Sequence, residues 1–249
     1  MTNRHPIKKS VSEKSPGRLP LIGDSAPAFD AETTQGTIHF PRDYTGKWVI
    51  LFSHSSDFTP VCTSEFMAFS RLVEECRNLN TELVGLSVDS LSSHVAWLYA
   101  IQEQIKFRGL KNINIRFPLI ADLSQTIARR YGMLHPEASE TKTVRAVFFI
   151  DPDGIIRTIL YYPITTGRNF AEIMRILISL QTTDEFGVST PANWQPGEDV
   201  VLPETETAPT ESTNIKKNNV QKSAGWFQAD SALSADKIKS KLHKHKKQV

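Results

Sequence analysis

The alternation of apolar runs and polar segments along the chain predicts a sheet of buried strands with helices between them. Residues 47–53, KWVILFS, form a short apolar run with β-branched side chains, which is typical of a buried strand. Similar runs follow at 82–88, ELVGLSV, and at 117–121, FPLIA. Spacings of three and four residues predict helices around these strands, and the apolar positions are Phe66, Phe69, Leu72, Val73, Cys76 and Leu79, then Val95, Leu98, Ile101 and Ile105.

The segment 144–162, VRAVFFIDPDGIIRTILYY, carries the clearest local signal. Two strand-like runs flank a turn rich in Asp, Pro and Gly, which predicts an antiparallel hairpin. A short helix is predicted before it at 124–131, and an amphipathic helix after it at 169–180. This order favours an α/β fold with a central mixed sheet and helices on both of its faces.

Composition divides the chain into three parts. We expect a flexible N-terminal arm at 1–18, a compact domain at 19–185 and an extended C-terminal arm at 186–249. Within that arm, 193–203 is expected to be ordered, and the polar stretch 203–221 is expected to be a flexible linker.

The overall composition excludes several functional classes. Hydrophobic residues make up 39% and charged residues 22% of 249 residues, which is ordinary for a soluble globular protein. A net charge of +2 does not favour nucleic-acid binding, and no apolar run reaches the ~18 residues of a membrane span. Two cysteines do not make a disulfide framework and indicate a reducing compartment. Residues 1–20 lack the apolar core of a secretory signal, and their few acids and several serines leave an organelle transit peptide as an alternative to a solvated arm. We expect a cytoplasmic location.

One of the two cysteines, Cys62, stands in FSHSSDFTPVCTSEF, between a predicted strand and a predicted helix. A cysteine at a helix N-terminus has a lowered pKa, and ligands usually bind at such strand–loop–helix junctions. Thr59 is close enough in sequence to place its hydroxyl in the same pocket. Placement by itself leaves a buried structural cysteine as an equal alternative, because free cysteines are often core residues.

The string DFTPVCTSEF resembles the active-site motif of peroxiredoxins, which are thiol peroxidases on a thioredoxin-like fold. Further segments resemble this family in the same order over roughly residues 19–203, and they are GDSAPAF, LVGLSVDS, FPLIAD, VRAVFFIDPDGIIR and LYYPITTGRNFAEI. NWQPGEDVV, at 193–201, resembles the start of the C-terminal arm of the one-cysteine and archaeal-type subgroup. The resemblance implies a thioredoxin-like α/β fold with this arm as a dimerisation element.

The resemblance also implies roles for three catalytic residues. Cys62 matches the cysteine that attacks the peroxide, and Thr59 matches the hydroxyl that holds it. Arg145 matches the arginine that keeps the thiolate ionised and polarises the O–O bond. Peroxide cleavage needs a thiolate and fixed donors for the developing charge, and arginine is such a donor because it stays protonated.

Four further residues are expected at the substrate site. Arg168 matches a second arginine and His54 a histidine near the peroxide, and Pro60 and Val61 belong to the same motif as Cys62. We expect no metal site, because there is no C-x-x-C pair and the histidines are scattered. No glycine-rich phosphate loop is present, and no cofactor is predicted.

The sequence departs from the family at Ser55, seven residues before Cys62, where peroxiredoxins usually have a proline that shields the cysteine. The change is expected either to open the pocket or to alter the loop. It places the efficiency in question more than the reaction.

The second cysteine, Cys76, is predicted to be a core residue, because it shares the apolar face of its helix. If it lies on one helix with Cys62, the 14 residues between them span about 21 Å. A disulfide needs Cα atoms within about 7 Å.

Archaeal-type relatives carry resolving cysteines in the C-terminal arm. The corresponding stretch here, KSAGWFQAD, has Ser223 near that place. Either an external thiol resolves Cys62, or a natural cysteine was replaced at this position. We expect Trp226 and Phe227 to pack on a partner subunit.

These observations predict a peroxidase that reduces hydrogen peroxide and organic hydroperoxides through a Cys62 sulfenic acid, in antioxidant defence and redox homeostasis. The expected partners are an external thiol (thioredoxin-like, glutathione or another) and a second copy of the chain, in a homodimer or a decamer. One alternative is a holdase chaperone or a redox-signalling partner on the same fold. Another is a cysteine hydrolase that uses Cys62 and His54, although no orienting Asn or Asp motif stands out.

Overall fold

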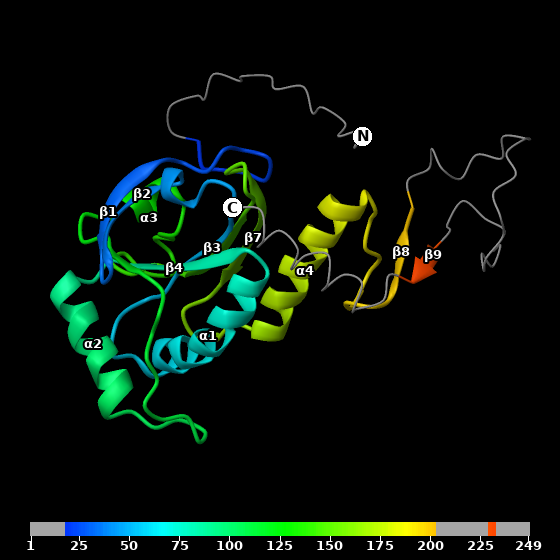
Figure 1. Ribbon diagram of the computed structural model, residues 1–249. Coiled ribbons are helices and arrows are strands. Elements are labelled where there is room, and N and C mark those ends of the chain that lie inside the picture. The colour runs from blue at the N-terminus through cyan, green and yellow to red at the C-terminus, as the bar shows by residue number, and fades with distance from the viewer. Residues whose placement is uncertain (1–17, 203–228, 233–249) are drawn as a thin grey trace, which may run out of the picture.

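The computed structural model describes residues 18–202 and 229–232 (Figure 1). Seven strands form one sheet in the order β2-β1-β5-β4-β3-β6-β7. Their bounds are β1 Phe29–Thr33, β2 Gly36–Phe40, β3 Trp48–Ser53, β4 Thr81–Ser87, β5 Leu119–Ala121, β6 Arg145–Ile150 and β7 Ile156–Tyr162. The helices are α1 Pro60–Asn78, α2 Leu91–Glu103, α3 Thr126–Arg130 and α4 Phe170–Phe186, with a short 3₁₀ helix η1 at Arg42–Tyr44.

The sheet is mixed, as the sequence predicts. Strand β3 pairs in parallel with β4, and β4 with β5, while β6 pairs antiparallel with β3 and β7 pairs antiparallel with β6. The β6–β7 hairpin confirms the predicted one at 144–162. Helix α2 ends at Glu103, so the helix predicted from the apolar positions Val95 to Ile105 was too long at its C-terminal end, and Ile105 lies in the following loop.

Strand β3 is buried on both faces, and its side chains divide between two apolar clusters. Ile50 and Phe52 belong to the cluster that contains residues of α1 and α4, while Val49 and Leu51 belong to the cluster that contains residues of α3. Because side chains alternate along a strand, one continuous apolar run supplies both faces. The predicted arrangement with helices on both faces is confirmed.

The hairpin of β1 and β2 was not predicted from the sequence. Its five paired positions run from Phe29 opposite Phe40 to Thr33 opposite Gly36. The strands are short and lie at one edge of the sheet, so only part of each is buried and the apolar pattern is weak. Gly36 adopts φ 101°, a conformation that favours glycine, and it allows the tight turn between the strands.

Beyond α4, strand β8 at Asp199–Val201 pairs antiparallel with β9 at Ala229–Ala232. The stretch expected to be ordered, 193–203, thus carries a strand. Ser223, Trp226 and Phe227 lie outside the described residues. Over the described ranges, no helix is both long and apolar enough to cross a membrane.

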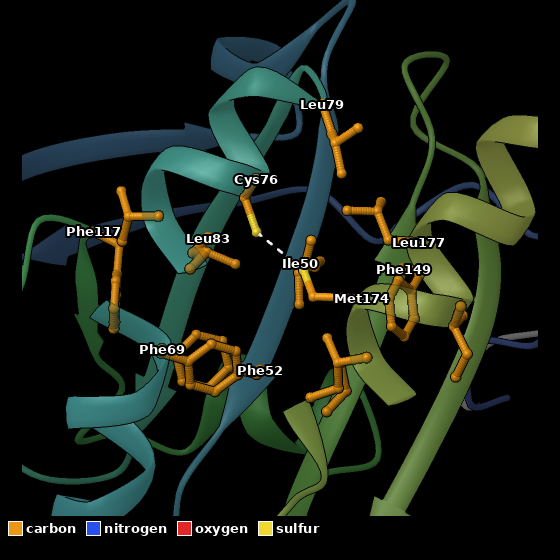
Figure 2. Close-up of a cluster of buried hydrophobic side chains, with 14 of the residues drawn as sticks. Ile50, Phe52, Phe69, Cys76, Leu79, Leu83, Phe117, Phe149, Met174 and Leu177 are labelled. Atoms are coloured by element: carbon orange, nitrogen blue, oxygen red, sulfur yellow. Dashed lines mark hydrogen bonds between the residues drawn. The ribbon is translucent and has the colours of Figure 1, made fainter. Parts of the chain in front are cut away.

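Cys76 lies in the apolar cluster between the sheet and the helices α1 and α4 (Figure 2). It is 1% exposed, and its thiol donates to the sulfur of Met174 at 3.8 Å. Burial raises the pKa of this thiol to about 12, since a thiolate is poorly solvated there. The predicted core role of Cys76 is confirmed, and its helix is also the helix of Cys62.

A variant with Cys62→Ser keeps Cys76 as its one thiol and tests this burial. We expect iodoacetamide to leave the folded variant unlabelled at neutral pH, because the thiol is both buried and protonated. In denaturant the same thiol should react at the rate of a free cysteine, as read by mass spectrometry. Rapid labelling of the folded variant would contradict the packing of Cys76.

Candidate active site

Cys62 is the third residue of α1, directly after the segment that leaves the end of β3. Pro60 starts the helix, which suits proline because the first helical position needs no backbone donor. Thr59 occupies the N-cap, and its carbonyl accepts from the backbone N–H of Thr63 at 2.9 Å. The positive end of a 19-residue helix therefore lies at the Cys62 side chain, where it favours a thiolate.

In the part of the chain that the structure describes, two groups form hydrogen bonds with the sulfur of Cys62. The hydroxyl of Ser55 lies 3.3 Å from it, and Nη1 of Arg145 donates to it at 3.3 Å. Cys62 is 0% exposed, so Ser55 does not leave the sulfur open to solvent.

The pKa of Cys62 results from opposing influences. Burial by itself raises the pKa of the thiol, because desolvation disfavours the charged form. The imidazole of His54 overcomes this effect, assisted by the hydroxyl of Ser55, and the pKa falls to about 5. The thiolate is therefore the main form at neutral pH.

A buried carboxylate, Glu65, joins two arginines next to Cys62. Arg145 donates to it at 2.7 Å, and Arg168 donates to both of its oxygens at 2.6 and 3.0 Å. All three side chains are at most 2% exposed. Two guanidinium groups and one carboxylate leave one excess positive charge, which a thiolate at Cys62 can balance.

Each arginine is also held by backbone carbonyls. Arg145 donates from Nε and Nη2 to the carbonyl of Ile164, at 3.0 and 2.8 Å. Nη1 of Arg168 donates to the carbonyls of Ser53 and Ala146, at 3.0 and 3.2 Å. Arg145 thus reaches the sulfur directly, whereas Arg168 is linked to it through Glu65.

His54 lies between aromatic rings and acidic groups. Its ring stacks on Trp97 at a centroid distance of 5.0 Å and meets the edge of Phe66 at 4.9 Å. Its Nε2 is 3.7 Å from the carboxylate of Asp57, and within the described part neither ring nitrogen has a partner with hydrogen-bond geometry. His54 therefore lowers the Cys62 pKa because it lies close to the sulfur, and neither of its ring nitrogens is engaged by another described residue.

Asp57 is shared between His54 and a second histidine, His94. Nδ1 of His94 lies 2.9 Å from one Asp57 oxygen, and its Nε2 donates to the carbonyl of Ile120 at 3.1 Å. Ligand atoms of His54, Asp57 and His94 all lie within 4.8 Å of one another, so this buried group could hold a metal ion. In the structure Asp57 and His94 bind each other, and the absence of a metal site stays a prediction.

The remaining predicted residues directly precede Cys62, at the start of α1. The Thr59 hydroxyl donates to the carbonyl of Ser56 at 2.9 Å, which leaves its lone pairs available as acceptors. Pro60 is exposed and Val61 is partly buried. Phe58, beside them, adopts φ 55° and is 57% exposed, so the segment before α1 holds a conformation that is unfavourable for a bulky residue.

The structure thus brings Cys62, Thr59, Arg145 and His54 together. Arg168 does not contact the sulfur and is connected to this group through Glu65. Sequence reasoning missed Glu65, Asp57 and His94. A glutamate at the third position after Cys62 in a helix that buries that face was the available signal for Glu65. Asp57 and His94 are 37 positions apart, and only the fold brings them together.

Two family descriptions match the chain. The AhpC/TSA family covers residues 22–159, and the C-terminal domain of 1-Cys peroxiredoxin covers residues 179–212. A peroxiredoxin of Methanosarcina mazei is 56% identical over 84% of this chain and 96% of its own length. The chain is a peroxiredoxin. One from Aquifex aeolicus is 53% identical over 72% of this chain and 78% of its own length.

Solved structures agree with this assignment. A yeast mitochondrial 1-Cys peroxiredoxin superimposes with a TM-score of 0.66 and 42% identity, over 75% of this chain and 88% of its own. Peroxiredoxin 6 of Arenicola marina gives the same TM-score with 36% identity, over 74% and 84% of the two chains. The predicted thioredoxin-like fold and the one-cysteine resemblance are both confirmed.

The function follows at the level of the family. The chain is a thiol-dependent peroxidase, an oxidoreductase with an antioxidant role. The alternative of a chaperone or signalling partner with weak turnover is not favoured by these relatives.

Glu65→Gln tests the buried ion cluster. We expect the free energy of unfolding to fall by about 3–5 kcal/mol, because two buried cations lose their counter-charge. Attraction to Arg168 outweighs desolvation and lowers the pKa of Glu65 in the folded protein. The stabilisation is therefore fully present above the pKa that Glu65 has in the unfolded chain, and it is lost as pH falls through the pKa that Glu65 has in the folded protein. The gap between wild type and variant in denaturant titrations should therefore narrow in acid.

The matched control for this variant is Glu172→Gln. Glu172 pairs with Arg175 on the surface, where an ion pair contributes about 0–1 kcal/mol. Equal losses in the two variants would contradict the importance assigned to the cluster.

His54→Phe tests the effect of the imidazole on Cys62. The variant keeps a ring between Phe66 and Trp97 but removes both nitrogens, so the Cys62 pKa should rise from about 5. Stability should be unchanged or higher, because a buried imidazole without hydrogen-bond partners is replaced by an apolar ring. Thiolate absorbance against pH gives the pKa. His135→Phe, which changes a ring outside the site, should leave the titration unmoved.

Proposed function

We propose that Cys62 is the thiol that attacks the peroxide. Its pKa of about 5, at a helix N-terminus and in contact with Arg145, is the observation that carries the proposal. The thiolate attacks one peroxide oxygen, an S–O bond forms, and the O–O bond breaks. The sulfur loses two electrons to the leaving oxygen, which takes up a proton and departs as water or an alcohol. Cys62 becomes a sulfenic acid.

Arg145 and Thr59 are the groups that we assign to the peroxide. Arg145 already donates to the sulfur and can share that donor with the developing charge on the leaving oxygen. Thr59 has a hydroxyl whose proton is held by Ser56, so its oxygen can accept from a peroxide O–H. Arg168 orients Arg145 through Glu65, and Pro60 and Val61 border the substrate.

The enclosure of Cys62 favours small substrates, namely hydrogen peroxide and small organic hydroperoxides. Because the sulfur is 0% exposed, a peroxide reaches it by displacing side chains of the segment before α1. That segment includes Phe58 in a left-handed conformation, a strain that displacement can relieve.

We infer that an external thiol regenerates Cys62. The other cysteine lies 14 residues along the same helix, about 21 Å away, and is buried in the core. A small or protein thiol attacks the sulfenic sulfur, water leaves, and a second thiol releases Cys62 from the mixed disulfide. Glutathione and thioredoxin-like proteins are the candidate reductants, and both systems are named for the yeast relative.

We propose a homodimer as the basic assembly, with a decamer as the larger form. Strand β7 lies at one end of the seven-stranded sheet, where a second copy can pair with it. Helix α2 presents Val95 and Tyr99, which are 55% and 62% exposed, as an apolar face for a further contact. We assign the C-terminal arm, 186–249, to dimerisation and residues 19–185 to the peroxidase domain, and the expected linker, 203–221, lies outside the described residues.

The cytoplasm is the location that we propose, because both cysteines are free thiols and the chemistry depends on a reducing thiol pool. Of the arm expected at 1–18, residues 1–17 lie outside the described residues.

Stopped-flow reaction of the reduced protein with hydrogen peroxide tests the role of Cys62. We expect rapid oxidation in the wild type and in Cys76→Ser, and no reaction above that of a free thiol in Cys62→Ser. Mass spectrometry should find sulfenic acid at Cys62 and sulfinic acid with excess peroxide. A peroxidase reaction that survives Cys62→Ser, or a Cys62–Cys76 disulfide in the folded protein, would overturn the assignment.

A further inference from the structure

Ser55 is a buried residue whose hydroxyl faces the reactive sulfur. Ser55 is 2% exposed, and its Oγ lies 3.3 Å from Sγ of Cys62. Within the described residues, that sulfur is the hydrogen-bond partner of the hydroxyl. A buried hydroxyl normally has a partner, and here the partner is the atom that reacts.

The direction of this hydrogen bond follows from the charge of the sulfur. Between a hydroxyl and a neutral thiol, either group can donate. A thiolate has no proton, so it can only accept, and the hydroxyl of Ser55 must then donate. A hydrogen bond to an ionised acceptor is stronger than a neutral one, so the contact favours the thiolate.

The backbone on both sides of Ser55 is fixed, so the hydroxyl is held in place before any substrate binds. His54 donates its N–H to the carbonyl of Leu86 at 2.9 Å, and its own carbonyl accepts from Thr143 at 2.6 Å. Two residues farther on, the N–H of Asp57 donates to Asp89 at 3.1 Å. Little orientational entropy remains to be lost when the bond to sulfur forms.

We propose that Ser55 is a further catalytic residue of this chain, whose hydroxyl donates a hydrogen bond to the Cys62 thiolate. Peroxiredoxins usually have proline at this position, and proline offers neither a side-chain donor nor an N–H. The serine therefore adds a donor that such relatives lack. The inference rests on the proposed role of Cys62 as the attacking thiol.

The added donor has two opposite consequences. It lowers the proportion of protonated thiol at acidic pH, and so extends activity to lower pH. It also holds electron density on the sulfur, and the nucleophilicity of a thiolate falls as its pKa falls. Loss of the hydroxyl should therefore slow the reaction in acid but leave it equal or faster at alkaline pH, a crossing that a loss of packing would not produce.

Ser55→Ala and Ser55→Pro, both in a Cys76→Ser background, isolate the effect on a single thiol. We expect the Cys62 pKa to rise by about one unit in both variants, because one unit corresponds to one hydrogen bond to a charged group. Thiolate absorbance and the pH dependence of iodoacetamide labelling both measure this pKa. With a wild-type pKa of about 5, the thiolate fraction near pH 5 should fall about fivefold, and the peroxide rate there should fall by about twofold or more because the remaining thiolate is more nucleophilic. Near pH 8 it should be unchanged or higher.

Ser55→Thr retains a hydroxyl and should keep the wild-type titration. The matched control is Ser56→Ala, which removes the neighbouring hydroxyl that donates to Asp89 instead of to the sulfur. Proline is the residue that the family resemblance places at this position, so that variant tests the hydroxyl even if alanine disturbs packing. An unchanged pKa in Ser55→Pro, or an equal shift in Ser56→Ala, would overturn the proposal.

The labelling experiment needs no peroxide, so the two proposals fail separately. Normal peroxide reduction with unaltered titrations in both Ser55 variants would refute the role of Ser55 alone. A raised pKa in those variants together with peroxide reduction that survives Cys62→Ser would refute the role of Cys62, and the serine would then have no catalytic part.

Discussion

The site depends on the buried ion cluster in which Glu65 accepts from Arg145 and Arg168. Charges of this kind are stable in a protein interior only when they are paired and hydrogen-bonded, and every donor described for these arginines meets an acceptor. The cluster joins α1, the start of β6 and the segment before α4. Since one positive charge remains unbalanced, the same pairing that holds these elements together also favours a thiolate at Cys62.

The two cysteines show how far environment decides reactivity. Both lie on α1 and both are buried, yet the pKa is about 5 at Cys62 and about 12 at Cys76. Cys76 has Met174 and apolar side chains around it, so desolvation acts without opposition. Cys62 lies at the helix N-terminus among donors and near an imidazole. Burial is common to both, and the polar neighbours make the difference.

A second set of contacts connects His54, beside Cys62, to strand β5. Asp57 connects His54 to His94, and His94 is anchored on β5 through Ile120. The aromatic rings of Phe66 and Trp97 fix the plane of His54. Residues from four parts of the chain thereby define the position of one imidazole beside the sulfur.

The sequence by itself determined the order of the central strands and helices, the β6–β7 hairpin, the family and the candidate reactive cysteine. These features depend on local periodicity and on contiguous motifs such as DFTPVCTSEF, which are visible along the chain. Short edge strands such as β1 and β2 were missed, because their half-buried residues give a weak pattern. Only the tertiary structure showed that Glu65 pairs with two arginines, that Asp57 meets His94, and that the serine in place of proline faces the sulfur. Those relations join residues far apart in sequence or depend on side-chain direction, and folding alone brings such groups within hydrogen-bond distance.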